Sequence, residues 1–199
     1  MNTPDMITDL ILDSNTKTIL SKWSVEKNKH IIITGCTGCG KTHLAQDMLK
    51  FINCSFTMLS TMVRIGKISI NNLLENTFSN SNILNYYQKS EKAILFDECE
   101  TYVINIENIH AEWPDNFIIF IFDKLPTEYT KNKRLKDVIF IHLNPPESLI
   151  IEKALEKCPS LNRDIIKQYF NDGDIRSLFR KLNFIEYTAK KTFFDESLL

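Results

Sequence analysis

The sequence is poor in glycine, in cysteine and in long apolar runs, and each shortage excludes a class of protein. No apolar run reaches the roughly 18 residues that cross a bilayer, and the first residues, with Asp5 and Asp9, lack the basic-then-apolar layout of a signal peptide. The five cysteines are scattered and odd in number, which argues against a disulfide framework. The sequence has only five glycines, and it contains no low-complexity linker and no internal repeat. We therefore expect an intracellular protein with no membrane partner.

The composition fits an ordinary globular chain. Hydrophobic residues make up 43% of the 199 residues, which is enough for one sizeable core and a small satellite. The formal net charge of −1 provides no global positive field for nucleic acid. A DNA contact would have to come from a local patch or from an assembly.

Four continuous apolar runs indicate strands that are buried on both faces. These runs are residues 30–34, 93–96, 117–122 and 138–141. Such runs are typical of a parallel sheet sandwiched by helices. A further short strand is expected at 55–59, and apolar residues at helical spacing indicate helices at 43–51 and within 68–87. The predicted class is therefore α/β.

The pattern changes after Pro145 and Pro146. Helix-period apolar residues follow at 147–157, 161–170 and 175–187, with no strand candidate between them, and Ser160 and Asp174 are candidate helix caps. We expect an α/β nucleotide-binding core over residues 1–145 and a three-helix lid over residues 146–199.

A phosphate-binding loop lies between the first predicted strand and the helix that follows. Its glycines allow a tight turn that approaches phosphates, while backbone N–H groups and the helix N-terminus supply positive potential. Lys41 would reach the β and γ phosphates, and the Thr42 hydroxyl would ligate Mg²⁺. The residues expected to contact nucleotide in this segment are Gly35, Cys36, Thr37, Gly38, Cys39, Gly40, Lys41, Thr42 and His43. The predicted ligands are ATP and Mg²⁺.

The same loop contains a Cys-x-x-Cys pair, Cys36 and Cys39. In another setting this spacing indicates a redox pair or half of a zinc site. Because no second ligand pair exists in the sequence, zinc is disfavoured, and the simplest interpretation is small side chains at variable loop positions. One testable hypothesis is that oxidation joining these cysteines would distort the loop.

A second motif follows the predicted strand at 93–96. The strand ends in Asp97 and Glu98, which places Asp97 near the Mg²⁺ water shell and Glu98 as the base for the attacking water. Acids at strand ends are also common as solvated loop starts, but the upstream phosphate loop favours the catalytic interpretation.

Together these motifs resemble the AAA+ ATPases, and within them the replication factor C type of clamp loader. Residues 173–176, Gly-Asp-Ile-Arg, look like the sensor 2 motif that opens the last lid helix, and residues 140–146 resemble the strand and diproline that lead into the lid. Residues 5–23 resemble the segment that packs near the adenine, with Ile11 and Leu12 as contacts.

This resemblance implies three further roles. Arg176 would touch the γ-phosphate from the lid, and Asp123, at the end of the fourth strand, is the nearest candidate for sensor 1. Arg134 lies where the family supplies an arginine finger to a neighbouring subunit. Two departures stand out, because sensor 1 is often Asn, which can donate to phosphate, and because the usual Ser-Arg-Cys sequence around the finger is absent. A basic run such as 131–136 is also often a solvated face.

The function that the resemblance implies is an oligomeric ATPase that remodels a DNA-replication complex, loading a sliding clamp or a helicase. Clamp loader subunits carry a helical collar after the lid, and this sequence ends at Leu199 without one. Three alternatives stay open: a viral-type superfamily 3 helicase, a DNA-packaging ATPase, and an ATP-binding switch or adaptor that scarcely hydrolyses ATP. A small nucleotide kinase is disfavoured, because the chain has only five arginines for a second phosphate site.

Overall fold

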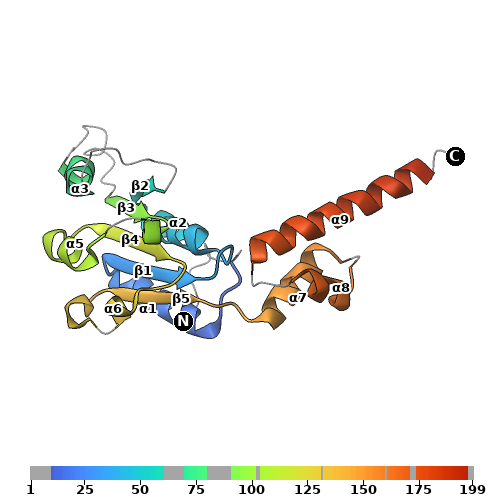
Figure 1. The fold of residues 1–199 in the computed structure, drawn as a ribbon, viewed down its shortest axis with the longest axis horizontal. Coiled ribbons are helices and arrows are strands. Elements are labelled where there is room, and N and C mark those ends of the chain that lie inside the picture. The colour runs from blue at the N-terminus through green and yellow to red at the C-terminus, as the bar shows by residue number, and fades with distance from the viewer. Residues whose placement is uncertain are drawn as a thin grey trace.

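The fold is centred on a five-stranded parallel sheet (Figure 1). The computed structural model describes residues 10–60, 70–79, 91–101, 104–130, 132–159, 161–170 and 174–196. The strands are β1 (His30–Gly35), β2 (Ser55–Leu59), β3 (Lys92–Phe96), β4 (Phe117–Phe122) and β5 (Ile139–Leu143). Their order across the sheet is β2-β3-β4-β1-β5. The predicted α/β class with a parallel sheet is confirmed.

The central strands are continuous apolar runs because both of their faces are covered. Every residue of β1 and of β4 is buried. In β5, at the sheet's edge, Phe140 and His142 are exposed, whereas Ile141 and Leu143 are buried. This strand starts one residue later and ends two residues later than predicted. The continuous apolar run ends at Ile141, but the strand continues with alternating exposed and buried side chains.

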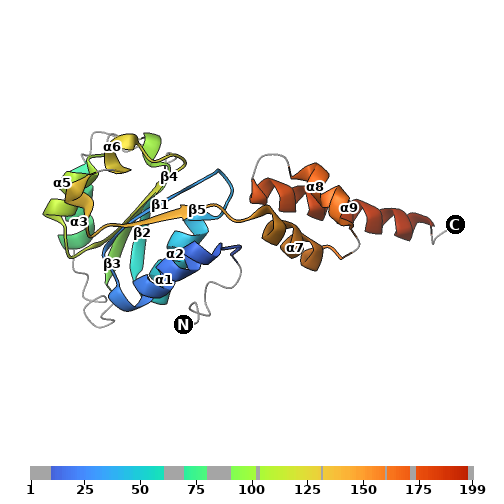
Figure 2. The same cartoon turned by 90° about the horizontal axis from the view of Figure 1, so that it is seen from below.

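Helices cover the sheet on two sides (Figure 2). One face packs against α1 (Ser14–Glu26) and α2 (Lys41–Phe51), and the other against α3 (Ile70–Ser79) and α5 (Ile106–Glu112). Alternate residues of β1 divide between these layers, since Ile31 and Ile33 join the first core cluster and Ile32 joins the second. Short elements complete this part: η2 (Cys99–Thr101), α6 (Thr127–Thr130) and η3 (Lys133–Leu135).

Among the described residues, the sequence analysis did not predict the helices α1 and α5 or the four-residue α6. The α1 helix begins after Asp13, whose carboxylate accepts the Thr16 N–H at 2.9 Å, and it buries Leu20 and Trp23. The α5 helix has only seven residues and begins after Asn105, whose side chain accepts the Asn108 N–H at 3.0 Å. Both starts carry an ordinary N-cap, which is the signal that could have predicted them.

Three helices follow the diproline, as predicted: α7 (Glu147–Lys157), α8 (Arg163–Tyr169) and α9 (Ile175–Glu196). They have a core cluster of their own, which includes Ile150, Ile166 and Leu178. Asn162 caps α8, whereas Ser160, the predicted cap, lies outside the described residues. The last helix runs well past its neighbours toward the C-terminus (Figure 1). Among the described residues, no helix is both long and apolar enough to cross a membrane.

Candidate nucleotide site

The strand order brings the candidate residues to one edge of the sheet. Strand β4 lies between β1 and β3, and all three are parallel. The loop after β1, Asp97 after β3 and Asp123 after β4 therefore meet at the carboxyl ends of adjacent strands. Ligands bind at this edge in open α/β sheets.

Lys41 is the centre of the loop. Its side chain is only 8% exposed, and its Nζ donates to the backbone oxygens of Gly35 at 2.7 Å and Cys36 at 2.9 Å. The same ammonium donates to Asp123 Oδ1 at 2.7 Å. A buried ammonium with three oxygen partners is fixed in place, and the Asp123 carboxylate is the one anionic group among them.

Asp123 is held over the loop from two sides. The Thr37 hydroxyl donates to Asp123 Oδ2 at 2.9 Å. The Glu100 carboxylate accepts the backbone N–H groups of Asp123 and Lys124, which fixes the end of β4. The hydrogen bond from Lys41, aided by the one from Thr37, holds the pKa of Asp123 below its usual value despite partial burial. The side chain therefore stands as an ionised carboxylate on Lys41.

The two candidate Mg²⁺ ligands are brought together. Thr42 Oγ1 donates to Asp97 Oδ2 at 3.0 Å. Among the described residues, no group of three or more His, Cys, Asp or Glu side chains could hold a metal ion alone. A hydroxyl beside one carboxylate fits Mg²⁺, because this ion usually takes few protein ligands and completes its shell with phosphate oxygens and water.

Glu98 lies beside this pair in an unusual backbone conformation. Its φ is 55°, in the left-handed region that residues other than glycine rarely adopt, and its N–H donates to Asp97 Oδ1 at 3.0 Å. The side chain is exposed. Such conformations cluster at functional sites, where the surrounding structure maintains them.

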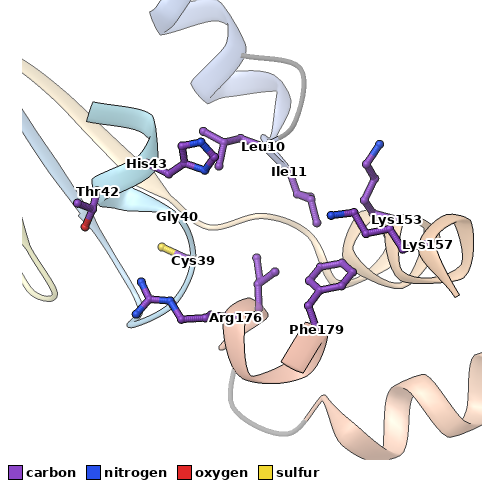
Figure 3. A pocket seen from close by; sticks show the side chains of 12 residues that line it. Leu10, Ile11, Cys39, Gly40, Thr42, His43, Lys153, Lys157, Arg176 and Phe179 are labelled. Atoms are coloured by element: carbon purple, nitrogen blue, oxygen red, sulfur yellow. The ribbon is translucent and has the colours of Figure 1, made fainter. Parts of the chain in front are cut away.

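A pocket of about 490 Å³ opens between the loop and the C-terminal helices (Figure 3). Ile11 faces Lys157 and Phe179 across it, and the Lys157 Nζ lies 4.9 Å from the centroid of the Phe179 ring. Leu12, expected here, is instead 4% exposed and belongs to the core beneath α1. The lining residues are Leu10, Ile11, Gly38, Cys39, Gly40, Thr42, His43, Lys153, Lys157, Ile175, Arg176 and Phe179.

The last helix touches the loop directly. The Arg176 N–H donates to the Gly38 oxygen at 3.3 Å. Asp174 caps α9 by accepting the Ser177 N–H at 2.9 Å, and its carboxylate lies so close to Gly38 that a Cβ there would overlap it. The Arg176 guanidinium points toward the loop (Figure 3). Gly173 lies outside the described residues.

Arg134 lies apart from these groups. Its side chain is 81% exposed on η3 and forms an ion pair with Glu107 Oε2 at 3.1 Å. The position is open to a neighbouring molecule, and Lys131, the first residue of the basic run, lies outside the described residues.

Sequence analysis missed several of the site's residues. Leu10, Lys153, Lys157 and Phe179 line the pocket, and Glu100 holds the end of β4. The spacing of Lys153 and Lys157 was visible as one helix face, but two lysines four residues apart are usually solvated. Glu100 gave no signal, because its partners are backbone groups more than twenty residues away.

Comparisons with known proteins agree with this geometry. Residues 31–121, a little under half of the chain, match the family model of the viral superfamily 1 RNA helicase core domain. No curated protein sequence matches the chain.

Solved structures give a broader likeness. A proline-to-glycine mutant of RuvB from Thermotoga maritima is similar over 96% of this chain and 68% of its own, with 13% identity and a TM-score of 0.65. An arginine-to-alanine mutant of that protein (15% identity, TM-score 0.59) and the RuvB Holliday junction branch migration motor (14%, 0.56) are each similar over 91% of this chain and 64% of their own. This chain thus spans about two thirds of their length. It has the P-loop NTPase fold in its AAA+ form.

Proposed function

We propose that this protein is a Mg²⁺-dependent ATPase of the AAA+ type. The observation that carries the proposal is the convergence of buried Lys41, the Thr42–Asp97 pair and a pocket of about 490 Å³ at one edge of the sheet. ATP would place its phosphates on the loop and its base between Ile11 and Phe179. Mg²⁺, when bound, would neutralise charge on the phosphates.

Each residue of the site would have its own role in binding or hydrolysis. Lys41 would bind the β and γ phosphates, Thr42 and Asp97 would hold Mg²⁺, and Glu98 would orient and deprotonate the attacking water. Arg176 would contact the γ-phosphate from the lid, residues 146–199, and its backbone bond to Gly38 would link lid position to the loop. Arg134 would act on the site of a neighbouring subunit, so hydrolysis would require a homo- or hetero-oligomer.

The client we propose is a nucleic-acid complex inside the cell. In the narrower form it is a DNA-replication complex, which the protein would remodel as a clamp loader does, with a sliding clamp or a helicase as partner. The second candidate is a viral-type helicase, favoured by the match of residues 31–121 to an RNA helicase core and by the likeness to a branch migration motor. Strand separation driven by ATP hydrolysis would favour the helicase, and DNA-stimulated turnover without strand separation would favour the clamp loader.

Two variants test the ATPase. Lys41→Ala should abolish ATP binding, because the phosphates lose the one buried lysine or arginine among the described residues. Glu98→Gln should keep binding and lower turnover by about 100-fold or more, the usual contribution of a general base. Glu112→Gln, which makes the same change at an exposed position on α5, is the matched control and should behave as wild type.

The assay is ATP hydrolysis by the wild type and each variant, with and without DNA or RNA. Tight ATP binding with negligible wild-type turnover under every condition would overturn the ATPase and favour a switch or adaptor. Equal turnover in Glu98→Gln would remove Glu98 from the mechanism.

A further inference from the structure

Two thiols occupy one turn of the phosphate loop. The Cys39 N–H donates to the Cys36 oxygen at 3.3 Å, so residues 36–39 form a β-turn. The first and fourth Cα atoms of such a turn lie within about 7 Å, which overlaps the roughly 4.4–6.8 Å found across disulfides. Cys39 Sγ lies 2.9 Å from the position of a Cβ built on Gly35, the neighbour of Cys36. The Cys36 side chain is a hydrogen-bond partner of the Cys39 thiol, so the two sulfur atoms lie close together.

The pair has the asymmetry of an attacking and a resolving thiol. Cys36 is exposed and lines a separate cavity of about 390 Å³ beside Pro145 and Pro146. Cys39 is 5% exposed, and burial raises its pKa to about 11, although Lys41 acts in the opposite direction. An oxidant therefore reaches Cys36 first and leaves Cys39 protected behind it.

The other three cysteines cannot take this part. Cys54, Cys99 and Cys158 are each buried, and they are far apart in the sequence. Burial raises the pKa of Cys54 to about 12 and that of Cys99 further still. Buried cysteines of this kind are inert toward oxidants.

We propose that Cys36 and Cys39 form a reversible disulfide that switches the phosphate loop off. The effect on nucleotide rests on the proposed function. A peroxide oxidises the Cys36 thiolate to a sulfenic acid and releases hydroxide. The Cys39 thiol then attacks the Cys36 sulfur, so that the S–S bond forms and water leaves. In sum, two thiols and one hydrogen peroxide give one disulfide and two waters, and a dithiol reductant reverses the bridge by exchange.

The bridge would change the loop where phosphates bind. The disulfide would enclose Thr37 and Gly38, whose backbone N–H groups must be free to bind the phosphates. It would also move Cys39 Sγ away from its packing position against Gly35. Gly38 also accepts the bond from Arg176, so the displacement reaches the lid. We expect the affinity for ATP to fall at least tenfold.

The test treats the full chain with hydrogen peroxide and follows two readouts. Peptide mapping by mass spectrometry should find the 36–39 bridge, and titration with a fluorescent ATP analogue should give the tenfold loss, restored by dithiothreitol. In Cys36→Ser the ratio of oxidised to reduced affinity should stay within twofold, whatever its own affinity. Cys54→Ser, whose hydroxyl can keep the 3.0 Å bond to the Glu91 oxygen, should respond as wild type.

The outcomes separate the two proposals. Absence of the bridge under peroxide overturns the modification site, independently of nucleotide. A bridge with less than twofold change in affinity overturns the switch. If the reduced protein does not bind ATP, the proposed function and the switch fail together, and the bridge is still decided by its mass.

Discussion

The Asp123 carboxylate is paired with Lys41, the cation to which the proposed function assigns the phosphates, and this predicts a gain of affinity for ATP when the carboxylate charge is removed. ATP must displace the carboxylate from the 2.7 Å ion pair before Lys41 can bind phosphate. In Asp123→Asn the carboxamide competes more weakly and no longer repels the phosphates. The variant should therefore bind ATP more tightly than the wild type.

The magnitude follows from the burial of the two partners. Lys41 is 8% exposed and Asp123 is 55% exposed. Exposed pairs contribute about 0.2–1 kcal/mol, and breaking a fully buried pair costs about 3–5 kcal/mol. Solvent screening at Asp123 places this pair near the lower range, at about 1 kcal/mol, which corresponds to roughly fivefold in affinity.

The assay is calorimetric or fluorescence titration of ATP with wild type, Asp123→Asn and Asp115→Asn. Asp115 lies in the turn before β4, whereas Asp123 follows its end, so the control makes the same charge change at the opposite edge of the sheet. Its affinity should equal that of the wild type. Weaker binding by Asp123→Asn would refute the competition and leave Asp123 as a group that supports the bound nucleotide.

Two further predictions concern stability. Burial, with His110 adding to it, lowers the pKa of His30 from 6.5 to about 4, so the unfolded chain binds more protons between these values and stability falls as pH drops through that window. Between pH 7 and 4.5, the free energy of unfolding measured by urea denaturation should fall by about 2–3 kcal/mol more in the wild type than in His30→Gln. Equal losses in the two proteins would contradict this role of His30. Gly38→Ala should cost about 1–3 kcal/mol by the same method, because Gly38 has a φ of 78° and its new Cβ overlaps Asp174. Adding Asp174→Ser should recover only the part of the stability loss that comes from the steric overlap. An unchanged urea midpoint in Gly38→Ala would disprove the close packing of Gly38 against Asp174.

The central strands were predictable because burial on both faces leaves an unbroken apolar run. β4 lies exactly where its run indicates, and β1 and β3 each differ by one residue. The same rule failed for α1, where only Thr16, Leu20 and Trp23 are buried among exposed polar residues. The segment 5–23 was predicted by resemblance to pack near the adenine, and of the two contacts named there Ile11 lines the pocket whereas Leu12 is buried in the core.

Local motifs predicted the loop and a shared Mg²⁺ site for Thr42 and Asp97, but the ion pair between Lys41 and Asp123 was not predicted. The pair of Lys41 and Asp123 joins residues 82 positions apart, and the pair of Thr42 and Asp97 joins residues 55 positions apart. Neither contact follows from composition or periodicity alone. Both follow from strand order, because β4 lies between the strands that precede the loop and Asp97.

This strand order also gives a meaning to Asp123, which departs from the sensor 1 pattern of the family that the sequence resembles. A side chain at the end of β4 must lie beside the loop, whatever its type, because β1 and β4 are paired through Thr34 and Phe122. An amide there would donate to phosphate, while a carboxylate accepts from Lys41 and repels phosphate. Thr37 and Glu100 hold this carboxylate in place, so under the proposed function it would be a competitor for phosphate where the resembled family has a phosphate sensor. Under the proposed function, ATP binding and release of Asp123 from Lys41 would be one coupled event, which the affinity of Asp123→Asn measures directly.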